Sequence, residues 1–177
     1  MKATGIVRRI DDLGRVVIPK EIRRTMRIRE GEPLEIYVDR EGEVILKKYS
    51  PINELGEFAK EYADSLYEAL GHVVCIADRD EIIAVSGGFK KDLLKKPIGT
   101  ALEEAINNRQ TMVLESEHSI STDDRVQFKN SVVSPIIANG DAIGAVIITT
   151  SEDARMGDLE KKLAETAASF LAKQMEE

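Results

Sequence analysis

Basic side chains concentrate near the beginning of this chain, although its overall composition is acidic. The stretch DDLGRVVIPKEIRRTM at residues 11–26 contains three arginines and a lysine, whereas the 177 residues together carry a net charge of −7. Residues 1–29 hold 9 Lys and Arg against 3 Asp and Glu, a balance of +6. A planar guanidinium group donates paired hydrogen bonds to a phosphate, which an ammonium group cannot do. The cluster therefore indicates an anionic partner, with a solvated charged surface as the alternative for charge alone.

The excess of positive charge is confined to the first part of the chain. Residues 1–50 have 12 basic and 9 acidic residues, a balance of +3, and residues 51–177 have 13 and 23, a balance of −10. Such an asymmetry points to a partner of the N-terminal part and not of the whole molecule. With 42% hydrophobic and 32% charged residues, the sequence is typical of a globular protein of one or two domains.

No run of the sequence approaches the roughly 18 apolar residues that span a membrane. The start MKATGIVRRIDD lacks the apolar core of a signal peptide, so we expect a cytoplasmic protein without a membrane partner. The single cysteine, Cys75, permits no internal disulfide and cannot supply a cysteine-based metal cage. It lies in an apolar run, where we expect it to pack as a small hydrophobic residue.

The first fifty residues predict a β-β-α-β-β module. Gly14 can take the positive φ that a tight turn requires, and Pro19 ends an extended run because it has no N–H to donate. Strands are expected at residues 3–10, 14–19, 32–39 and 43–49, with a short helix at 20–26. Apolar residues are consecutive at 16–18 and again at 44–46, so these strands need cover on both sides. Fifty residues bury too little surface alone, which predicts an intertwined homodimer.

The remainder of the chain predicts an α+β domain with an antiparallel sheet. An amphipathic helix with Asn53 as its N-cap is expected at residues 53–70, because apolar residues recur there at intervals of three and four. A closing helix is expected at 155–175. Between them, strands are expected at 72–78, 82–87, 111–115, 126–137 and 142–149, with a helix at 101–108.

Other residues of types that could act in catalysis or bind a ligand are expected to have structural roles. Asp11 and Asp12 could form a carboxylate pair for acid–base catalysis, but beside arginines in a turn they are expected to fix its geometry. His72 and His118 are far apart in sequence and lack a metal-binding motif. The run SGGFKK at residues 86–91 has neither the spacing nor the Lys-Ser/Thr of a phosphate-binding P-loop, so it is expected to be a turn. We therefore expect no catalytic residue, no metal and no cofactor.

The motifs TGIVR, LGRVVIP, LEIYVD and ILKKY lie in one register over residues 4–49. This stretch closely resembles the DNA-binding domain of the AbrB-type transition-state regulators, a swapped-hairpin barrel to which two chains contribute. The C-terminal pattern of strands resembles a GAF-type domain. The resemblance implies a DNA-binding regulator of transcription, an activator or a repressor, acting on sporulation genes.

The resemblance places the DNA contacts on five arginines, Arg8, Arg9, Arg15, Arg23 and Arg24, which a twofold dimer would double. Their guanidinium groups could hydrogen-bond phosphates or the edge of guanine, and affinity should then fall steeply with salt. Duplex DNA is expected, because no aromatic platform for single strands accompanies them. Lys20 departs from the apolar or small residue that is usual for the family, and its role is left open.

The expected domains are a DNA-binding domain at residues 1–50, a linker at 51–55 and a GAF-like regulatory domain at 56–177. Helices of the GAF-like domain would join two barrel dimers into a homotetramer, and a small-molecule effector could bind among residues 86–100 and 115–129. Two alternatives stay open. Related barrels occur in antitoxins that bind a toxin protein, and some GAF-type proteins reduce sulfoxides, which would need more cysteines than Cys75.

Overall fold

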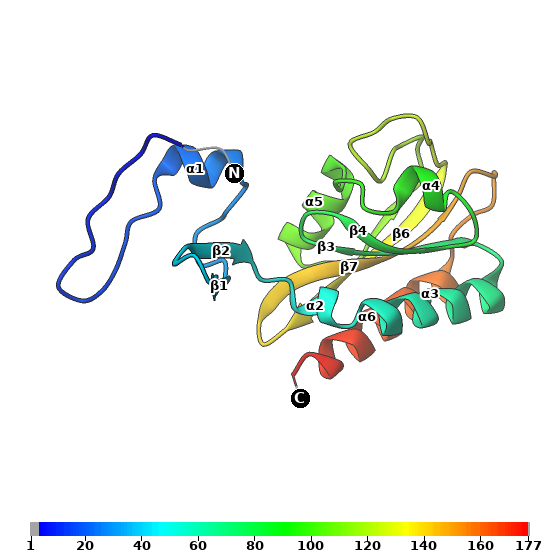
Figure 1. Cartoon of the computed structure of the whole chain (residues 1–177). Coiled ribbons are helices and arrows are strands. Elements are labelled where there is room, and N and C mark those ends of the chain that lie inside the picture. Colours follow the sequence, from blue (N-terminus) through cyan, green and yellow to red (C-terminus); the bar gives the residue numbers. More distant parts are fainter. Residues whose placement is uncertain (1–3, 177) are drawn as a thin grey trace. The chain divides into compact units, whose positions relative to one another are not determined.

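The computed structural model describes residues 4–176 and separates into two compact units, Met1–Tyr49 and Ser50–Glu177 (Figure 1). The first unit contains helix α1 (Lys20–Thr25) and strands β1 (Leu34–Val38) and β2 (Val44–Lys48). The two strands pair antiparallel, from Leu34 opposite Lys48 to Val38 opposite Val44. The expected helix and the second pair of strands are confirmed, with ends that differ by a few residues.

The expected strands at residues 3–10 and 14–19 are not formed in the single chain. For the single chain, that prediction was wrong. Residues 4–10 and 15–19 carry no strand pairing, whereas residue 3 lies outside the described part. In Figure 1 they are the two arms of an open loop that precedes α1. Extended backbone becomes a strand only when a neighbouring segment satisfies its N–H and C=O groups. We call residues 4–10 and 15–19 the two arms below.

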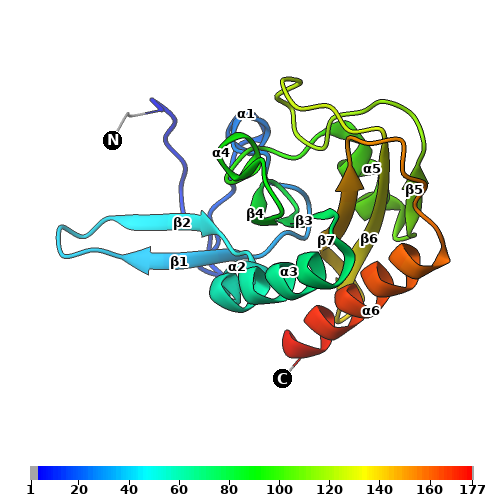
Figure 2. The ribbon, with the colours of Figure 1, turned by 90° about the vertical axis from the view of Figure 1, so that its right-hand side faces the viewer.

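The second unit is built on a five-stranded antiparallel sheet in the order β4-β3-β7-β6-β5 (Figure 2). Its strands are β3 (Val73–Asp78), β4 (Ile82–Ser86), β5 (Met112–Leu114), β6 (Asn130–Ala138) and β7 (Asp141–Thr150). Its helices are α2 (Pro51–Glu54), α3 (Gly56–Leu70), α4 (Lys90–Leu93), α5 (Thr100–Asn108) and α6 (Asp158–Gln174). The predicted α+β domain with an antiparallel sheet is thus confirmed.

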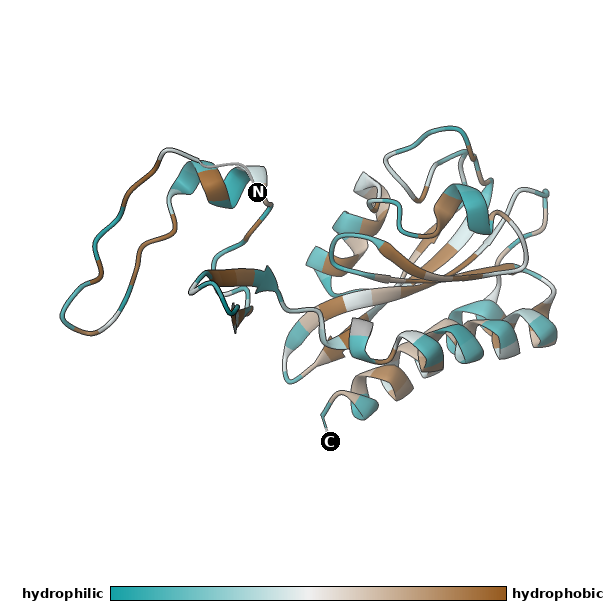
Figure 3. Cartoon of the chain, in the orientation of Figure 1, coloured by the Kyte–Doolittle hydropathy of each residue, from teal (hydrophilic) through white to brown (hydrophobic). Residues whose placement is uncertain are grey.

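Apolar side chains on both faces of this sheet form two separate cores. On β3, Val74 and Ile76 belong to the core beneath α3 and α6, while Cys75 and Ala77 belong to the core on the side of α4 and α5. Successive residues of a strand point to opposite faces, so a strand buried on both sides is continuously apolar. Figure 3 shows the corresponding hydrophobic colour along the central strands.

The helix boundaries differ from the predictions at three places. The helix expected from Asn53 is divided at Leu55 into α2 and α3, where Gly56 has low helix propensity. Residues 90–93 form the short helix α4 within and beyond the expected turn. The closing helix begins at Asp158 because the Glu160 side chain accepts the Gly157 N–H at 2.7 Å, which caps the helix there. None of the helices in the described part is long and apolar enough to cross a membrane.

Candidate nucleic-acid interface

A tight turn joins the two arms and positions Arg15. The Asp11 carboxylate accepts the N–H groups of Leu13 at 3.1 Å and Arg15 at 2.7 Å, and Gly14 has a φ of +76°. The same carboxylate accepts the Nε–H of Arg15 at 2.8 Å. These hydrogen bonds, led by the Arg15 backbone N–H, lower the pKa of Asp11 below its usual value of 3.8. Asp11 therefore fixes the turn, as expected, and the Arg15 side chain stays 71% exposed.

Helix α1 carries Arg23 and Arg24. It begins directly after Pro19, whose φ of −58° suits a helix start, and it ends where the Ile28 N–H bonds the Arg23 carbonyl at 2.8 Å. The Arg24 side chain is exposed, whereas Arg23 is half-buried and its Nε has no hydrogen-bond partner among the described residues. The helix thus presents one free and one partly sheltered guanidinium group.

A hollow of about 400 Å³ lies against this helix and brings basic side chains together. Its lining consists of Lys20, Arg23, Arg24, Arg27, Ile28 and Arg29. Of the five candidate arginines, Arg23 and Arg24 belong to this hollow. The other three do not line it: Arg8 and Arg9 lie on the first arm and Arg15 follows the turn, all exposed.

Three cations of the hollow were not among the sequence candidates, although the count of +6 for residues 1–29 included them. Arg29 is engaged within its own unit, because its N–H bonds Glu32 Oε2 at 2.7 Å and its Nη1 lies 4.0 Å from Glu32 Oε1. Lys20 and Arg27 are exposed and make no ion pair within residues 4–176. Local charge density is the signal that could have identified them.

The alternative that Arg23 and Arg24 are an ordinary charged helix surface requires local pairing with Glu21. Within the part of the chain that the structure describes, Glu21 makes no ion pair with either arginine. Like charges on neighbouring turns repel each other. The uncompensated cluster is therefore typical of a surface that meets an anion.

The candidate groups of the second unit have structural roles. The ring of His118 is held at both nitrogens, with Nδ1 at 2.6 Å from the Ser116 carbonyl and Nε2 at 2.7 Å from Ser131 Oγ. Among the described residues, no group of three His, Cys, Asp or Glu side chains could hold a metal. Cys75 is fully buried, and burial raises the pKa of its thiol to about 12. The reactive thiolate form is therefore suppressed.

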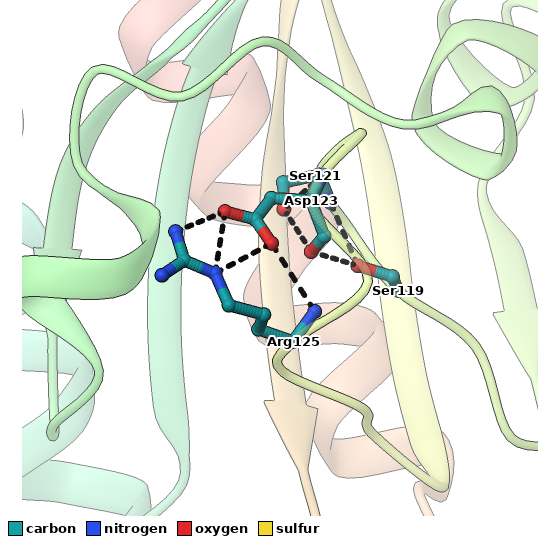
Figure 4. A network of polar contacts seen from close by, with 4 residues as sticks. All are labelled: Ser119, Ser121, Asp123 and Arg125. Atoms are coloured by element: carbon teal, nitrogen blue, oxygen red, sulfur yellow. Dashed lines mark hydrogen bonds and ion pairs between the residues drawn. The ribbon is translucent and has the colours of Figure 1, made fainter.

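The segments expected to surround an effector pack onto the sheet. Ile98 and Leu93 from the first segment, and Ile120 and Phe128 from the second, are buried in the core on the side of α4 and α5. Figure 4 shows the polar network that shapes the second segment. The hydroxyl groups of Ser119 and Ser121 donate to the Asp123 carbonyl at 3.2 and 3.0 Å.

Asp123 completes this network through its side chain, which pairs with the Arg125 guanidinium. Nε of Arg125 lies 2.8 Å from Oδ1 of Asp123. The pair, chiefly through the side-chain hydrogen bond, lowers the pKa of Asp123 to about 2. The loop is thus ordered by its own side chains.

Comparison with known proteins identifies the family. Residues 54–176 match the family model described as the stage V sporulation protein T C-terminal, transcription factor. The whole chain is 62% identical to stage V sporulation protein T of Bacillus subtilis (strain 168), with 100% of both chains covered. The chain belongs to the stage V sporulation protein T family. It is therefore a member of a family of sporulation transcription factors.

The N-terminal module of this stage V sporulation protein T relative is AbrB-like. Over 51 residues it is 67% identical to the transition state regulatory protein AbrB of Bacillus subtilis (strain 168), which covers 29% of this chain and 52% of that protein. Residues 7–54 also match the family model described as antidote-toxin recognition MazE, bacterial antitoxin. The resemblance stated from the sequence is confirmed.

The second unit of this chain has a GAF-like fold. The GAF domain of an Acinetobacter phosphoenolpyruvate-protein phosphotransferase has a TM-score of 0.57 at 12% identity, covering 68% of this chain and 81% of that one. A free methionine-R-sulfoxide reductase from Neisseria meningitidis has a TM-score of 0.57 at 19% identity, covering 68% and 77%. At these identities the likeness concerns the fold alone.

Proposed function

We propose that this transcription regulator binds duplex DNA through Arg8, Arg9, Arg15, Arg23 and Arg24 of two chains. The observation that carries the proposal is a basic surface on which Arg8, Arg9 and Arg24 are exposed without an ion pair among the described residues, within a module that is 67% identical to AbrB. The acidic remainder, at −10 over residues 51–177, would discourage DNA from binding elsewhere. Guanidinium groups suit both phosphates and guanine edges, so the same surface could position the duplex and read it.

The two arms support a homodimer in which each chain completes the other. Their backbone has no strand partner in the single chain, and Val7 and Val17 are 87% and 71% exposed. Paired arms from two copies would satisfy the backbone groups and cover these valines. Such a dimer doubles the five arginines on one twofold surface. We assign residues 1–50 to this DNA-binding domain.

Helices α3 and α6 support a further association between dimers. Phe170 of α6 lies 5.4 Å from Tyr62 and 5.8 Å from Phe58 of α3, measured between ring centroids. Phe170 is still 38% exposed, and Leu159 on the same helix is 61% exposed. A helical bundle with a second copy would bury these side chains and give a tetramer. A small effector or this packing would then set the separation of two barrels and change which sites are bound.

The regulatory domain is assigned to residues 56–177, after a connecting segment at 51–55. That segment contains α2, and its Ile52 is fully buried in the core beneath α3 and α6. A short, packed connection would transmit the arrangement of the regulatory domains to the barrels more directly than a flexible tether. If residues 1–55 alone bound DNA with the stoichiometry and affinity of the whole chain, that result would contradict this coupling.

An enzymatic role is not favoured. The sulfoxide reductases share the GAF-like fold, but Cys75 is buried with its pKa raised to about 12 and is the only cysteine of the chain. The match of residues 7–54 to the MazE antitoxin model favours a second candidate, binding of a toxin-like protein by the N-terminal module. Exposed valines on the arms could serve either partner. DNA titration separates these functions.

The test is a titration of the whole chain on duplex promoter DNA across salt concentrations. The variants Arg8→Ala, Arg15→Ala and Arg23→Ala should each weaken binding, and each lost phosphate contact should reduce the slope of log K against log salt by about 0.9. Arg40→Ala, at the exposed tip between β1 and β2, is the matched control. Binding that ignores salt, or no loss in any of the three variants, would reject DNA as the partner.

A further inference from the structure

We propose that Lys20 and Arg27 bind DNA backbone phosphate together with Arg23 and Arg24, as a clamp along helix α1. The inference rests on the proposed function and extends it to two residues that the family resemblance does not supply. The clamp is defined as these four side chains, which all line the 400 Å³ hollow. Through Lys20 and Arg27 it would position the duplex without adding to the reading of its sequence.

The charges of the hollow identify which cations are available. Arg29 is already engaged within its own unit, because Glu32 accepts its backbone N–H and lies beside its guanidinium group. Lys20, Arg24 and Arg27 are exposed and have no ion pair within the described residues. Lys20 and Arg24 are four residues apart on one helix, a spacing at which like charges destabilise each other. The cluster therefore needs an external anion to become favourable.

The backbone conformation of Arg27 is one in which arginine is less stable than glycine, so helix stability does not explain the arginine. Arg27 has a φ of +53°, the left-handed region that favours glycine just after a helix. Its N–H bonds the Arg24 carbonyl at 3.2 Å, and the next N–H, of Ile28, bonds the Arg23 carbonyl at 2.8 Å. Glycine would fit this helix end without the steric cost that an L side chain meets there. A charged side chain at a strained position is typical of a functional contact.

The chemistry of the lining favours phosphate over other ligands. Arginine and lysine side chains are donors without acceptors, so the ligand must offer acceptor oxygens. The Arg23 side chain lines the hollow, and its buried Nε has no hydrogen-bond partner among the described residues. The only uncharged side chain of the hollow is Ile28, and no aromatic ring lines it for stacking on a base. An open, donor-only surface next to Arg24 fits the backbone of a duplex.

The experiment measures binding of the whole chain to a 40-base-pair duplex of random sequence from about 50 to 200 mM salt, a range chosen from the expected salt dependence. Arg27→Ala, Arg27→Gly and Lys20→Ala should each remove two phosphate contacts from the dimer, one per chain, and so reduce the salt slope by about 1.8 and weaken binding about tenfold or more at the higher salt. Arg40→Ala should keep the slope of the unchanged protein. The same loss should appear on promoter DNA, because the contacts are to phosphate.

Thermal unfolding separates the clamp from a structural role. Arg27→Gly should raise the unfolding midpoint while binding falls, whereas Arg27→Ala should lower binding without that gain. Slopes unchanged in the Lys20 and Arg27 variants, with Arg23→Ala still impaired, would overturn the clamp and leave the proposed function standing. Slopes unchanged in all of them would overturn both. A lowered midpoint in Arg27→Gly would overturn the argument from backbone strain.

Discussion

The N-terminal module contains two turns with the same hydrogen bonds but different surroundings. Asp11 and Asp39 each accept two backbone N–H groups through Oδ1, from residues two and four positions ahead. In each turn the aspartate N–H bonds the carbonyl four residues on, at 3.0 Å to Arg15 and 3.1 Å to Glu43. Yet the second turn joins the paired strands β1 and β2, and the first joins the two unpaired arms.

The difference separates what a turn encodes from what a strand needs. Five residues with aspartate first and glycine fourth suffice for the turn, because all of its hydrogen bonds are local. A strand needs a neighbour, and the arms have none in one chain. Only Pro19 is buried within residues 4–49, whereas the second unit encloses two hydrophobic cores. The first unit therefore has no hydrophobic core of its own in a single chain, whereas the second unit has two.

The largest expected effect comes from placing a charge on an arm. Val17→Asp should halve the particle mass of the whole chain and abolish DNA binding, because an interface between paired arms would bury an unpaired carboxylate. Sedimentation and DNA titration measure the two results. Arg40→Asp adds the same charge at the exposed turn between β1 and β2 and should leave the mass unchanged.

Unchanged mass and DNA affinity in Val17→Asp would show that the arms do not form an interface. If mass fell by half and DNA binding persisted, the arms would associate chains without building the DNA surface. The comparison between the two turns makes the arms, and not β1 and β2, the place where such a charge should act most strongly.

The next effect tests the unit that is complete in one chain. Gly144 of β7 lies so close to β3 that an added Cβ would stand 2.2 Å from the Ala77 carbonyl oxygen. Gly144→Ala should therefore destabilise the second unit by about 1–3 kcal/mol or more, measured by urea unfolding. Gly56→Ala is the control, because an added Cβ meets no atom within 4 Å and helix propensity improves by up to about 1 kcal/mol. Equal stabilities would mean that β3 and β7 separate readily.

The sequence predicted the elements whose contacts are local or periodic. Strands β1 and β2 and the central strands of the sheet followed from apolar runs, and the Asp11 turn followed from its composition. The arms were predicted as strands from the same kind of apolar run. Such a run indicates that its valines must be buried, but it does not indicate which segment or which chain pairs with it. Leu55 separates α2 from α3 within a continuous apolar pattern, so periodicity could not reveal the break.

The sequence predicted where the positive charge of the candidate site lies but not which of its side chains lie together. The sequence located positive charge in residues 1–29, and the family resemblance selected five arginines from it. The involvement of Glu32 with Arg29 and the left-handed backbone of Arg27 depend on folding of the segment after α1. No spacing rule relates these residues. This is why Arg27 stands out in the structure and not in the sequence.

A smaller effect compares the two aspartates directly. Asp39→Ala should destabilise the β1–β2 hairpin by about 1 kcal/mol, because the N–H groups of Glu41 and Glu43 lose their acceptor. Asp11→Ala removes the equivalent bonds of the first turn, and its effect should appear as weaker association of the arms. Urea unfolding and sedimentation of both variants provide the measurements. If Asp39→Ala weakened the association of chains and Asp11→Ala did not, the association would be assigned to β1 and β2.

The smallest effect is the pH dependence of the first turn. The pKa of Asp11 is lowered chiefly by the Arg15 backbone N–H and next by its guanidinium. A lowered carboxyl pKa contributes stability that is present above the ordinary value of 3.8 and is lost as pH falls through the folded value. Carbon-13 NMR of the Asp11 carboxyl should therefore give a midpoint below 3.8. Arg15→Ala should raise this midpoint only part of the way, since the backbone N–H remains. If the midpoint returned to 3.8 in that variant, the ion pair with Arg15 would be the cause of the lowered pKa. The backbone hydrogen bonds of the turn, which the Asp39 turn also has, would then not be the cause.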